Sequence, residues 1–233
     1  MSSVLFDQIE SSKDIISVSE STLVIIGLEI SNIIPIAEEH NIISISYSSF
    51  DVSDVSYHNS SLELMIVIFS TGSIQNISGS NITEPDDSTI SLDYMFLFRT
   101  TTIHMFDSIH FYDISLSNPT LIEVISSDIH SLKNHSMSNT NTVIYTLEHA
   151  NVFDSESVSV TNSASAFDIV DSTLTISSSS FTMLNSTLLS ALYSESSNVT
   201  ISNSTFDSNI AKQGAAITLL CDHDQSCVSS IDG

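Results

Sequence analysis

Apolar residues alternate with small polar ones along most of the chain. The segments 43–45, 174–176 and 199–201 each place two of Ile, Leu or Val on either side of a Ser or Thr. This two-residue period is that of a β-strand with one buried face, and turn-forming segments such as 194–198 separate the strands. Apolar stripes at the 3.6-residue spacing of helices are absent from the sequence. The pattern predicts an all-β protein made of short strands.

The alternating pattern repeats with a period of about 25 residues in the C-terminal half. The octet from Leu174 to Phe181 matches the octet from Val199 to Phe206. The same offset relates Phe167 to Leu192 and Leu192 to Ile217. A fixed period of this length is typical of solenoid proteins.

Further copies are expected in the rest of the chain. The octet from Ile43 to Phe50 has the same pattern. In this alignment Leu23 is the residue equivalent to Ile43 in the preceding copy. Leu62 is the equivalent residue in the following copy, which covers 62–69. These two turns would be shorter than the C-terminal ones, at about 20 residues each. In the middle, Phe111, Ile122 and Ile129 repeat the intervals seen from Phe181 onward. No single alignment stands out over 82–110 and 133–153, where we expect longer loops.

A repeat of about 20 to 28 residues built from short strands predicts a parallel β-helix. One such unit cannot bury its own apolar face, whereas stacked units place like residues about 4.8 Å apart in one continuous core. Helical repeats need Ala, Leu, Glu and Lys at helical spacing, and leucine-rich repeats need Leu at fixed positions with an Asn ladder. Neither pattern occurs here. We expect one β-helix domain over 1–233, as a segment of a longer β-helix.

One segment matches a known repeat closely. Phe206 and Asn209 form an F-x-x-N tetrad, and residues 214–217 follow as Gly-Ala-Ala-Ile. This segment resembles the F-x-x-N / G-G-A-I repeat of the polymorphic outer membrane protein family, with Ala215 in place of a Gly. Phe181 and residues 190–192 form a degenerate copy. The resemblance implies a right-handed parallel β-helix of a surface-exposed or secreted protein associated with adhesion.

The repeat motif assigns structural roles to its members. Phe206, like Phe181, would fill the core, and Ile217 would point inward as well. Asn209 could extend an amide ladder or hold a turn by bonding the backbone. Gly214 and Ala216 permit close approach of the backbone at a corner.

The charge of the chain excludes several partners. There are 4 Lys and Arg against 28 Asp and Glu, a formal net charge of −24. Binding to a phosphate backbone requires clustered cations, so no nucleic-acid partner is expected. The longest apolar run, 64–69, is far shorter than the roughly 20 residues that span a bilayer, so no membrane-spanning segment is expected. The alternation predicts that Ser, Asn and Asp cover the outside of the rod.

Two cysteines, Cys221 and Cys227, lie six residues apart near the C-terminus. They could close a small disulfide loop in an oxidising compartment or remain free thiols. A third alternative is a zinc site with the intervening residues Asp222, His223 and Asp224. Disulfide and free thiols are both favoured over zinc, so no metal is predicted.

Parallel β-helices also occur as pectin lyase-like enzymes, and catalysis is the alternative to be weighed. Glycoside hydrolysis needs carboxylates within about 5 to 10 Å of each other, and the nearest cluster in sequence is Asp86, Asp87 and Asp93. Acidic pairs are expected by chance in so acidic a chain, and the segment at 85–88 is typical of a turn. Cleavage of acidic polysaccharides is disfavoured because the net charge would repel them. No catalytic residue and no cofactor is predicted.

Two weaker signals concern the outer surface. Exposed rows of Asp could bind calcium weakly, although no defined calcium loop is present. N-x-S/T sequons, only slightly in excess of chance, give modest support to an extracellular location. They begin at Asn59, Asn76, Asn81, Asn134, Asn185, Asn198 and Asn203.

We therefore expect a non-enzymatic, extracellular or cell-surface β-helix segment that presents a Ser-rich and Asp-rich face to a protein or a glycan surface. We expect no secretory signal peptide within this sequence, because residues 1–7 lack a basic segment and an apolar segment. The alternative is a carbohydrate-active enzyme or a carbohydrate-binding module on the same fold.

Overall fold

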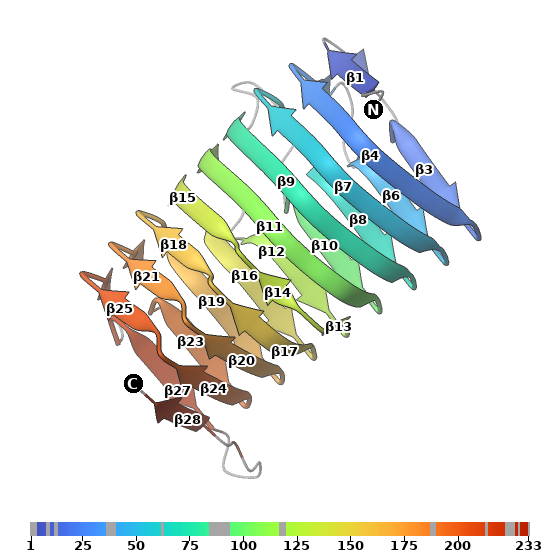
Figure 1. Cartoon of the computed structure of the whole chain (residues 1–233). Coiled ribbons are helices and arrows are strands. Elements are labelled where there is room, and N and C mark those ends of the chain that lie inside the picture. Colours follow the sequence, from blue (N-terminus) through green and yellow to red (C-terminus); the bar gives the residue numbers. More distant parts are fainter. Residues whose placement is uncertain are drawn as a thin grey trace.

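The chain winds into a stack of parallel coils, a parallel β-helix (Figure 1). The computed structural model describes residues 4–7, 10–11, 14–35, 41–61, 63–83, 94–116, 120–186, 190–212, 214–221, 227 and 229–232. Every strand pairing of these residues is parallel, and the strands of successive coils lie side by side from the blue N-terminal end of the rod to its red C-terminal end. None of the described residues forms a helix that could cross a membrane.

One flank of the rod is a nine-stranded sheet. Its strands, in spatial order, are β3 (Ile16–Ser19), β6 (Asn41–Ser46), β8 (Glu63–Ile68), β10 (Phe96–Arg99), β12 (Thr120–Ile125), β16 (Val143–Glu148), β19 (Ser165–Val170), β23 (Leu192–Glu195) and β27 (Ile217–Leu220).

The rest of the rod is covered by a fifteen-stranded sheet. Its main path runs through β1 (Val4–Asp7), β4 (Thr22–Ser31), β7 (Ser49–His58), β9 (Thr71–Thr83), β11 (Thr102–Ser115), β13 (Asp128–Ile129), β17 (Asn151–Glu156), β20 (Thr173–Ser177), β24 (Asn198–Ser202) and β28 (Ser229–Asp232). Beside this path lie β14 (Leu132–Lys133), β15 (Ser136–Thr140), β18 (Ser159–Thr161), β21 (Ser180–Thr182) and β25 (Thr205–Asp207). Two short pairs complete the list, β2 (Glu10–Ser11) with β5 (Ile34–Pro35) and β22 (Asn185–Ser186) with β26 (Ile210–Ala211).

Ladders of like residues fill the core between the sheets. On the nine-stranded sheet, one buried ladder runs through Ile43, Met65, Phe96, Ile122, Tyr145, Phe167 and Leu192. Because each strand pairs in register with the next, each apolar side chain has an apolar neighbour above and below it. This arrangement is the continuous core that the alternating pattern predicts.

The register of the C-terminal half confirms the predicted period. Leu174 pairs with Val199, and Phe181 pairs with Phe206. The intervals in the middle of the chain are also correct, because Phe111, Ile122 and Ile129 fall on the ladders of Phe181, Leu192 and Val199 respectively.

The predicted turn lengths of the N-terminal half are wrong. Leu23 pairs with Phe50, and Ile43 pairs with Ile16, so the first of these turns is longer than the expected interval from Leu23 to Ile43. The next pairing joins Ile43 to Met65 and not to Leu62, so this turn is also longer than expected. The copy at 62–69 predicts Phe69 in the core, but Phe69 is 49% exposed.

The two segments without a predicted alignment differ from each other. The expected long loop over 133–153 is absent, because Tyr145 pairs with Ile122 on one side and with Phe167 on the other, at intervals shorter than the C-terminal period. The segment 82–110 belongs to the longest turn of the nine-stranded sheet, in which Phe96 pairs with Met65 of the preceding coil. Part of that turn, 84–93, lies outside the described residues.

Three corners shape each coil, and each corner is made by a residue with left-handed backbone. The first corner holds Glu20, Tyr47, Phe69, Thr100, Ser126, His149, Asp171 and Ser196. The second holds Gly27, Asp54, Asn76, Ser108, Asn134, Ser157, Ser178 and Asn203. The third holds Asn32, Asn59, Asn81, Asp113, Asn139, Asn162, Met183 and Ser208. Asn, Asp and Ser dominate these positions, in keeping with the tolerance of Asn and Asp for positive φ.

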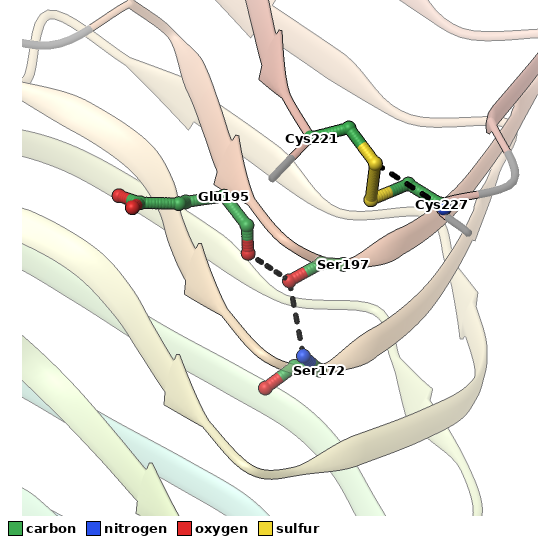
Figure 2. The surroundings of a disulfide bond; sticks show 5 residues. All are labelled: Ser172, Glu195, Ser197, Cys221 and Cys227. Carbon is green, nitrogen blue, oxygen red and sulfur yellow. Dashed lines mark hydrogen bonds between the residues drawn. A yellow bond between two sulfur atoms is a disulfide. The ribbon is translucent and has the colours of Figure 1, made fainter. Parts of the chain in front are cut away.

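A buried or partly buried serine follows the corner residue in many coils. Its hydroxyl donates to the carbonyl two residues earlier and accepts a backbone N–H from the preceding coil. Ser197, for example, donates to Glu195 O at 2.7 Å and accepts from Ser172 N at 3.0 Å (Figure 2). The same pair of bonds is made at Ser48, Ser60, Ser127, Ser172, Ser179 and Ser204.

These corner serines are an exception to the expectation that Ser covers the outside. A serine hydroxyl is small enough to turn inward at a corner, where it satisfies a backbone carbonyl and an N–H that would otherwise be buried without partners. The motif also explains the register error. The octets from Ile43 to Phe50 and from Leu174 to Phe181 have one pattern because each spans such a corner, but the first spans the first corner and the second spans the second corner.

Ser172→Ala tests the corner bonds. The change leaves the N–H of Ala150 without its acceptor, which lies 2.9 Å away at the Ser172 hydroxyl. We expect the free energy of unfolding to fall by about 1 to 3 kcal/mol, measured by denaturation in urea. Ser136→Ala, at an exposed position of β15, is the matched control with an expected change within about 0.5 kcal/mol. Equal effects of the two changes would contradict the corner role.

Candidate functional site

The residues of the predicted repeat motif lie where two coils meet. Phe181 is fully buried, and its ring lies 4.8 Å from that of Phe206. Phe206 is only partly buried, so the expectation of a core position is correct for Phe181 and too strong for Phe206. Asn209 follows the third corner at Ser208; its Oδ1 accepts from Leu184 N at 2.9 Å and its Nδ2 donates to Phe181 O at 3.0 Å. It therefore holds a turn through the backbone of the preceding coil.

The second half of the motif has a similar structural role. Gly214 has a φ of 54°, and the Thr218 hydroxyl occupies the place that a side chain at 214 would need. The carbonyl of Ala216 accepts a hydrogen bond from the N–H of Leu192 at 3.0 Å. Ile217 on β27 pairs with Leu192 on β23. Ala216 is exposed and Ile217 is partly buried. These residues shape the chain and present no chemical group to a ligand.

Cys221 and Cys227 form a disulfide in the structure (Figure 2). Their Cα atoms lie 5.9 Å apart, and the N–H of Cys227 points to the Cys221 sulfur at 3.3 Å. Asp222, His223 and Asp224, the other candidate zinc ligands, lie outside the described residues. The described residues hold no group of three or more His, Cys, Asp or Glu that could bind a metal.

Most of the sequon asparagines are corner residues. Asn76, Asn134 and Asn203 stand at the second corner, and Asn59 and Asn81 at the third. Several donate to the preceding coil, as Asn76 Nδ2 does to Asp54 Oδ1 at 3.0 Å and Asn134 Nδ2 to Asp107 Oδ1 at 2.8 Å. The backbone of the corners thus accounts for these asparagines without glycosylation. Asn185 and Asn198 lie in strands instead.

An open groove follows the first corner across four coils. We call it the corner groove, and its volume is about 770 Å³. It is lined by Glu20, Ser21, Thr22, Tyr47, Ser48, Ser49, Phe69, Ser70, Thr71 and Thr100. The groove is wide open to solvent and does not enclose a cavity.

Two aromatic rings belong to the lining of the corner groove. Tyr47 and Phe69 are 61% and 49% exposed, and their rings stack with centroids 5.0 Å apart at an interplanar angle of 13°. Both residues have a φ of 49°, because they are the corner residues of their coils. Thr22, Ser49 and Thr71, which pair in register and are exposed, begin the strands just after this corner.

A second group of polar residues lies on the outer face of the nine-stranded sheet. Asp168 pairs with Tyr193 on adjacent strands, and the Tyr193 hydroxyl donates to Glu195 Oε2 at 3.1 Å. Burial, and then the nearby Glu195 charge, raise the pKa of Asp168. A carboxyl with a raised pKa beside a second carboxyl is an arrangement that glycosidases use, so we call Asp168, Tyr193 and Glu195 the acidic patch.

A buried histidine lies in the core at the second corner. His135 follows Asn134 at the place that Ser179 and Ser204 hold in later coils. Its Nε2 donates to Phe106 O at 2.9 Å, so Nδ1 carries no proton and accepts from the Tyr145 hydroxyl. Burial lowers the pKa of His135 to about 3 and raises that of Tyr145. Both groups are neutral and act as structural partners.

This histidine predicts a pH dependence of stability. Below the ordinary pKa of 6.5 the unfolded chain binds a proton at His135 that the folded chain does not bind until about pH 3. The stabilisation is complete above pH 6.5, and it is lost by about 1.4 kcal/mol per unit as the pH falls toward 3. The double variant His135→Leu/Tyr145→Phe removes this contribution. Urea denaturation at pH 7, 5 and 4 should show a shallower decline for the variant, and parallel declines would contradict the assignment.

The carboxylates that the sequence analysis considers for catalysis fall in a part of the chain that the structure does not describe. Asp86, Asp87 and Asp93 lie outside the described residues. The corner groove and the acidic patch are not predicted by the sequence pattern. The groove depends on which corner a residue occupies, and the patch depends on the pairing of β19 with β23, neither of which can be read from the alternation.

Comparison of the chain with protein-family models, with curated proteins and with solved structures found no match.

Proposed function

We propose that this chain is a non-enzymatic β-helix segment of a surface-exposed or secreted protein, and that its outer faces make adhesion-type contacts with a partner surface. The proposal rests on one observation, an extended polar column on the outer face of the fifteen-stranded sheet. The column consists of Glu29, Ser56, Ser78, His110, Ser136, Ser159, Ser180 and Thr205, paired in register from coil to coil.

The column is suited to contacts over a wide area. Successive strands are about 4.8 Å apart, so its hydroxyls offer donors and acceptors at a regular spacing along the rod. A second polar column lies beside it, where the hydroxyls of Thr161 and Thr182 bond to each other at 3.1 Å. Because most of these side chains are short hydroxyls repeated along the rod, the column matches an extended partner better than a small substrate.

Variants of the column test the proposal. Beads coated with the protein should adhere to glycan-coated or protein-coated surfaces, and the double variant Ser136→Arg/Ser159→Arg should reduce adhesion about tenfold or more. Thr175→Arg/Thr200→Arg places the same charges on β20 and β24 and serves as the matched control. Equal adhesion of the two double variants would contradict the role of the column.

The acidic patch favours a second candidate, a carbohydrate-active enzyme on the same fold. Asp168 would be the general acid because its pKa is raised, and Glu195 would be the second carboxyl group of the pair. Release of reducing ends from neutral polysaccharides should then occur, and Asp168→Asn should abolish it. Absence of hydrolysis by the unaltered protein, together with adhesion that depends on the column, would decide for the non-enzymatic role.

A further inference from the structure

The aromatic pair of the corner groove is costly to the fold. Each corner position needs a left-handed backbone, which Asn, Asp and Ser adopt at most other corners. A bulky ring in this conformation is unusual, and left-handed backbone costs an ordinary residue about 1 to 2 kcal/mol. Tyr47 and Phe69 nevertheless hold two successive corners and leave their rings about half exposed or more. Strain and exposed apolar surface at one place indicate a role outside folding.

The groove combines apolar and hydroxyl surfaces. Beyond the ring pair, the flanking corner residues are Glu20 on one side and Thr100 on the other. Thr22, Ser49 and Thr71 add a line of exposed hydroxyls parallel to the rod axis, and Thr71 Oγ1 also bonds His104 Nε2 at 3.1 Å. A ligand that fits this lining has an apolar face for the rings and hydroxyls along its edges. Sugar rings have both.

The charges of the groove select among sugars. Its described lining contains one carboxylate, Glu20, and no Lys or Arg. The chain as a whole has a net charge of −24, which repels acidic polysaccharides. The four corner residues Glu20, Tyr47, Phe69 and Thr100 span about 14 Å along the axis at the usual strand spacing. This length accommodates more than one sugar unit.

We propose that the corner groove binds a neutral polysaccharide chain lying along the rod axis, with its sugar rings packed against the exposed parts of the stacked Tyr47 and Phe69 rings and its hydroxyls bonded to Thr22, Ser49 and Thr71. This site goes beyond the adhesion-type function, because it lies at the first corner and does not include the polar column. The two assignments are therefore tested by different variants.

Titration calorimetry with hexasaccharides of β-1,4-linked glucose, xylose and mannose tests the site. At least one of them should bind with one-to-one stoichiometry. Tyr47→Asn and Phe69→Asn should each weaken binding about tenfold or more while the protein stays folded, because Asn suits the left-handed corner. Phe153→Ala, which removes a ring 51% exposed elsewhere, should leave binding unchanged, as should Ser136→Arg/Ser159→Arg.

Three results would overturn the proposal. In the first, none of the neutral hexasaccharides binds. In the second, one of them binds with an affinity that Tyr47→Asn and Phe69→Asn do not alter. In the third, hexalysine binds instead and Glu20→Gln abolishes its binding, which would assign the groove to cationic peptides. Loss of bead adhesion in the column variants with intact hexasaccharide binding would confirm that the two sites are independent.

Discussion

Phe181→Ala should lower the free energy of unfolding by about 3 to 5 kcal/mol. The Phe181 ring is fully buried in a ladder with Val160 and Phe206 on the adjacent strands. It also meets the Phe167 ring edge-on, with centroids 5.9 Å apart. Removing it leaves a cavity between coils that regular strand pairing keeps from collapsing. Denaturation in urea, followed by far-UV circular dichroism, measures the change.

Two other phenylalanines are the controls for this prediction. Phe206 is partly buried, so Phe206→Ala should cost less than Phe181→Ala. Phe153 is 51% exposed, and Phe153→Ala should change the free energy of unfolding by no more than about 0.5 kcal/mol. If Phe206→Ala proved the most destabilising of the three, the assignment of Phe181 to the interior would be wrong.

Gly79→Ala should destabilise the protein by about 1 to 3 kcal/mol although it adds only a methyl group. Gly79 lies on the ladder between Tyr57 and Phe111. A Cβ at Gly79 would lie 2.5 Å from Phe111 Cδ1, inside the space of the ring. The large ring is accommodated because its neighbour has no side chain. A Cβ at Gly72 would likewise meet Phe50, at its carbonyl oxygen as well as at its ring.

A double-mutant cycle measures this complementarity. Phe111→Ala alone should cost about 3 to 5 kcal/mol, because the ring is buried. In Gly79→Ala/Phe111→Ala the added methyl group enters the space left by the ring, so the combined loss should be at least about 0.5 kcal/mol smaller than the sum of the two single losses. Additive losses would show that Gly79 does not make room for Phe111.

The alternation of apolar and hydroxyl residues is sufficient to predict strands, the coil and the C-terminal register. Leu174, Val199, Phe181 and Phe206 repeat at one spacing, and that spacing is the real length of a coil at the C-terminal end of the rod. In the N-terminal half, the same pattern places the octet from Ile43 to Phe50 on the wrong corner. A two-residue period allows several alignments, and only the stacking of corner serines such as Ser48 on Ser70 selects among them.

The candidate sites are less predictable than the fold. Tyr47 resembles any residue between two serines until its corner position and its stacking on Phe69 are known. Asp168 and Glu195 are distant in the sequence and become neighbours only through the pairing of β19 with β23. Single histidines spread along an acidic chain are expected at the surface, but His135 replaces an apolar or serine residue of the core ladder and is neutral there.

The most direct test of the coiled rod is a set of distances along one ladder. Ser53 lies on a ladder that continues through Gln75, Asp107, Lys133, Glu156, Ser177 and Ser202. Spin labels on cysteines introduced at Ser53 and at Glu156, Ser177 or Ser202, with the native cysteines replaced by Ser, should give backbone separations of about 19, 24 and 29 Å, a rise of about 4.8 Å for each coil. Distances that do not increase in equal steps would contradict the parallel β-helix and the surface assignments that depend on it.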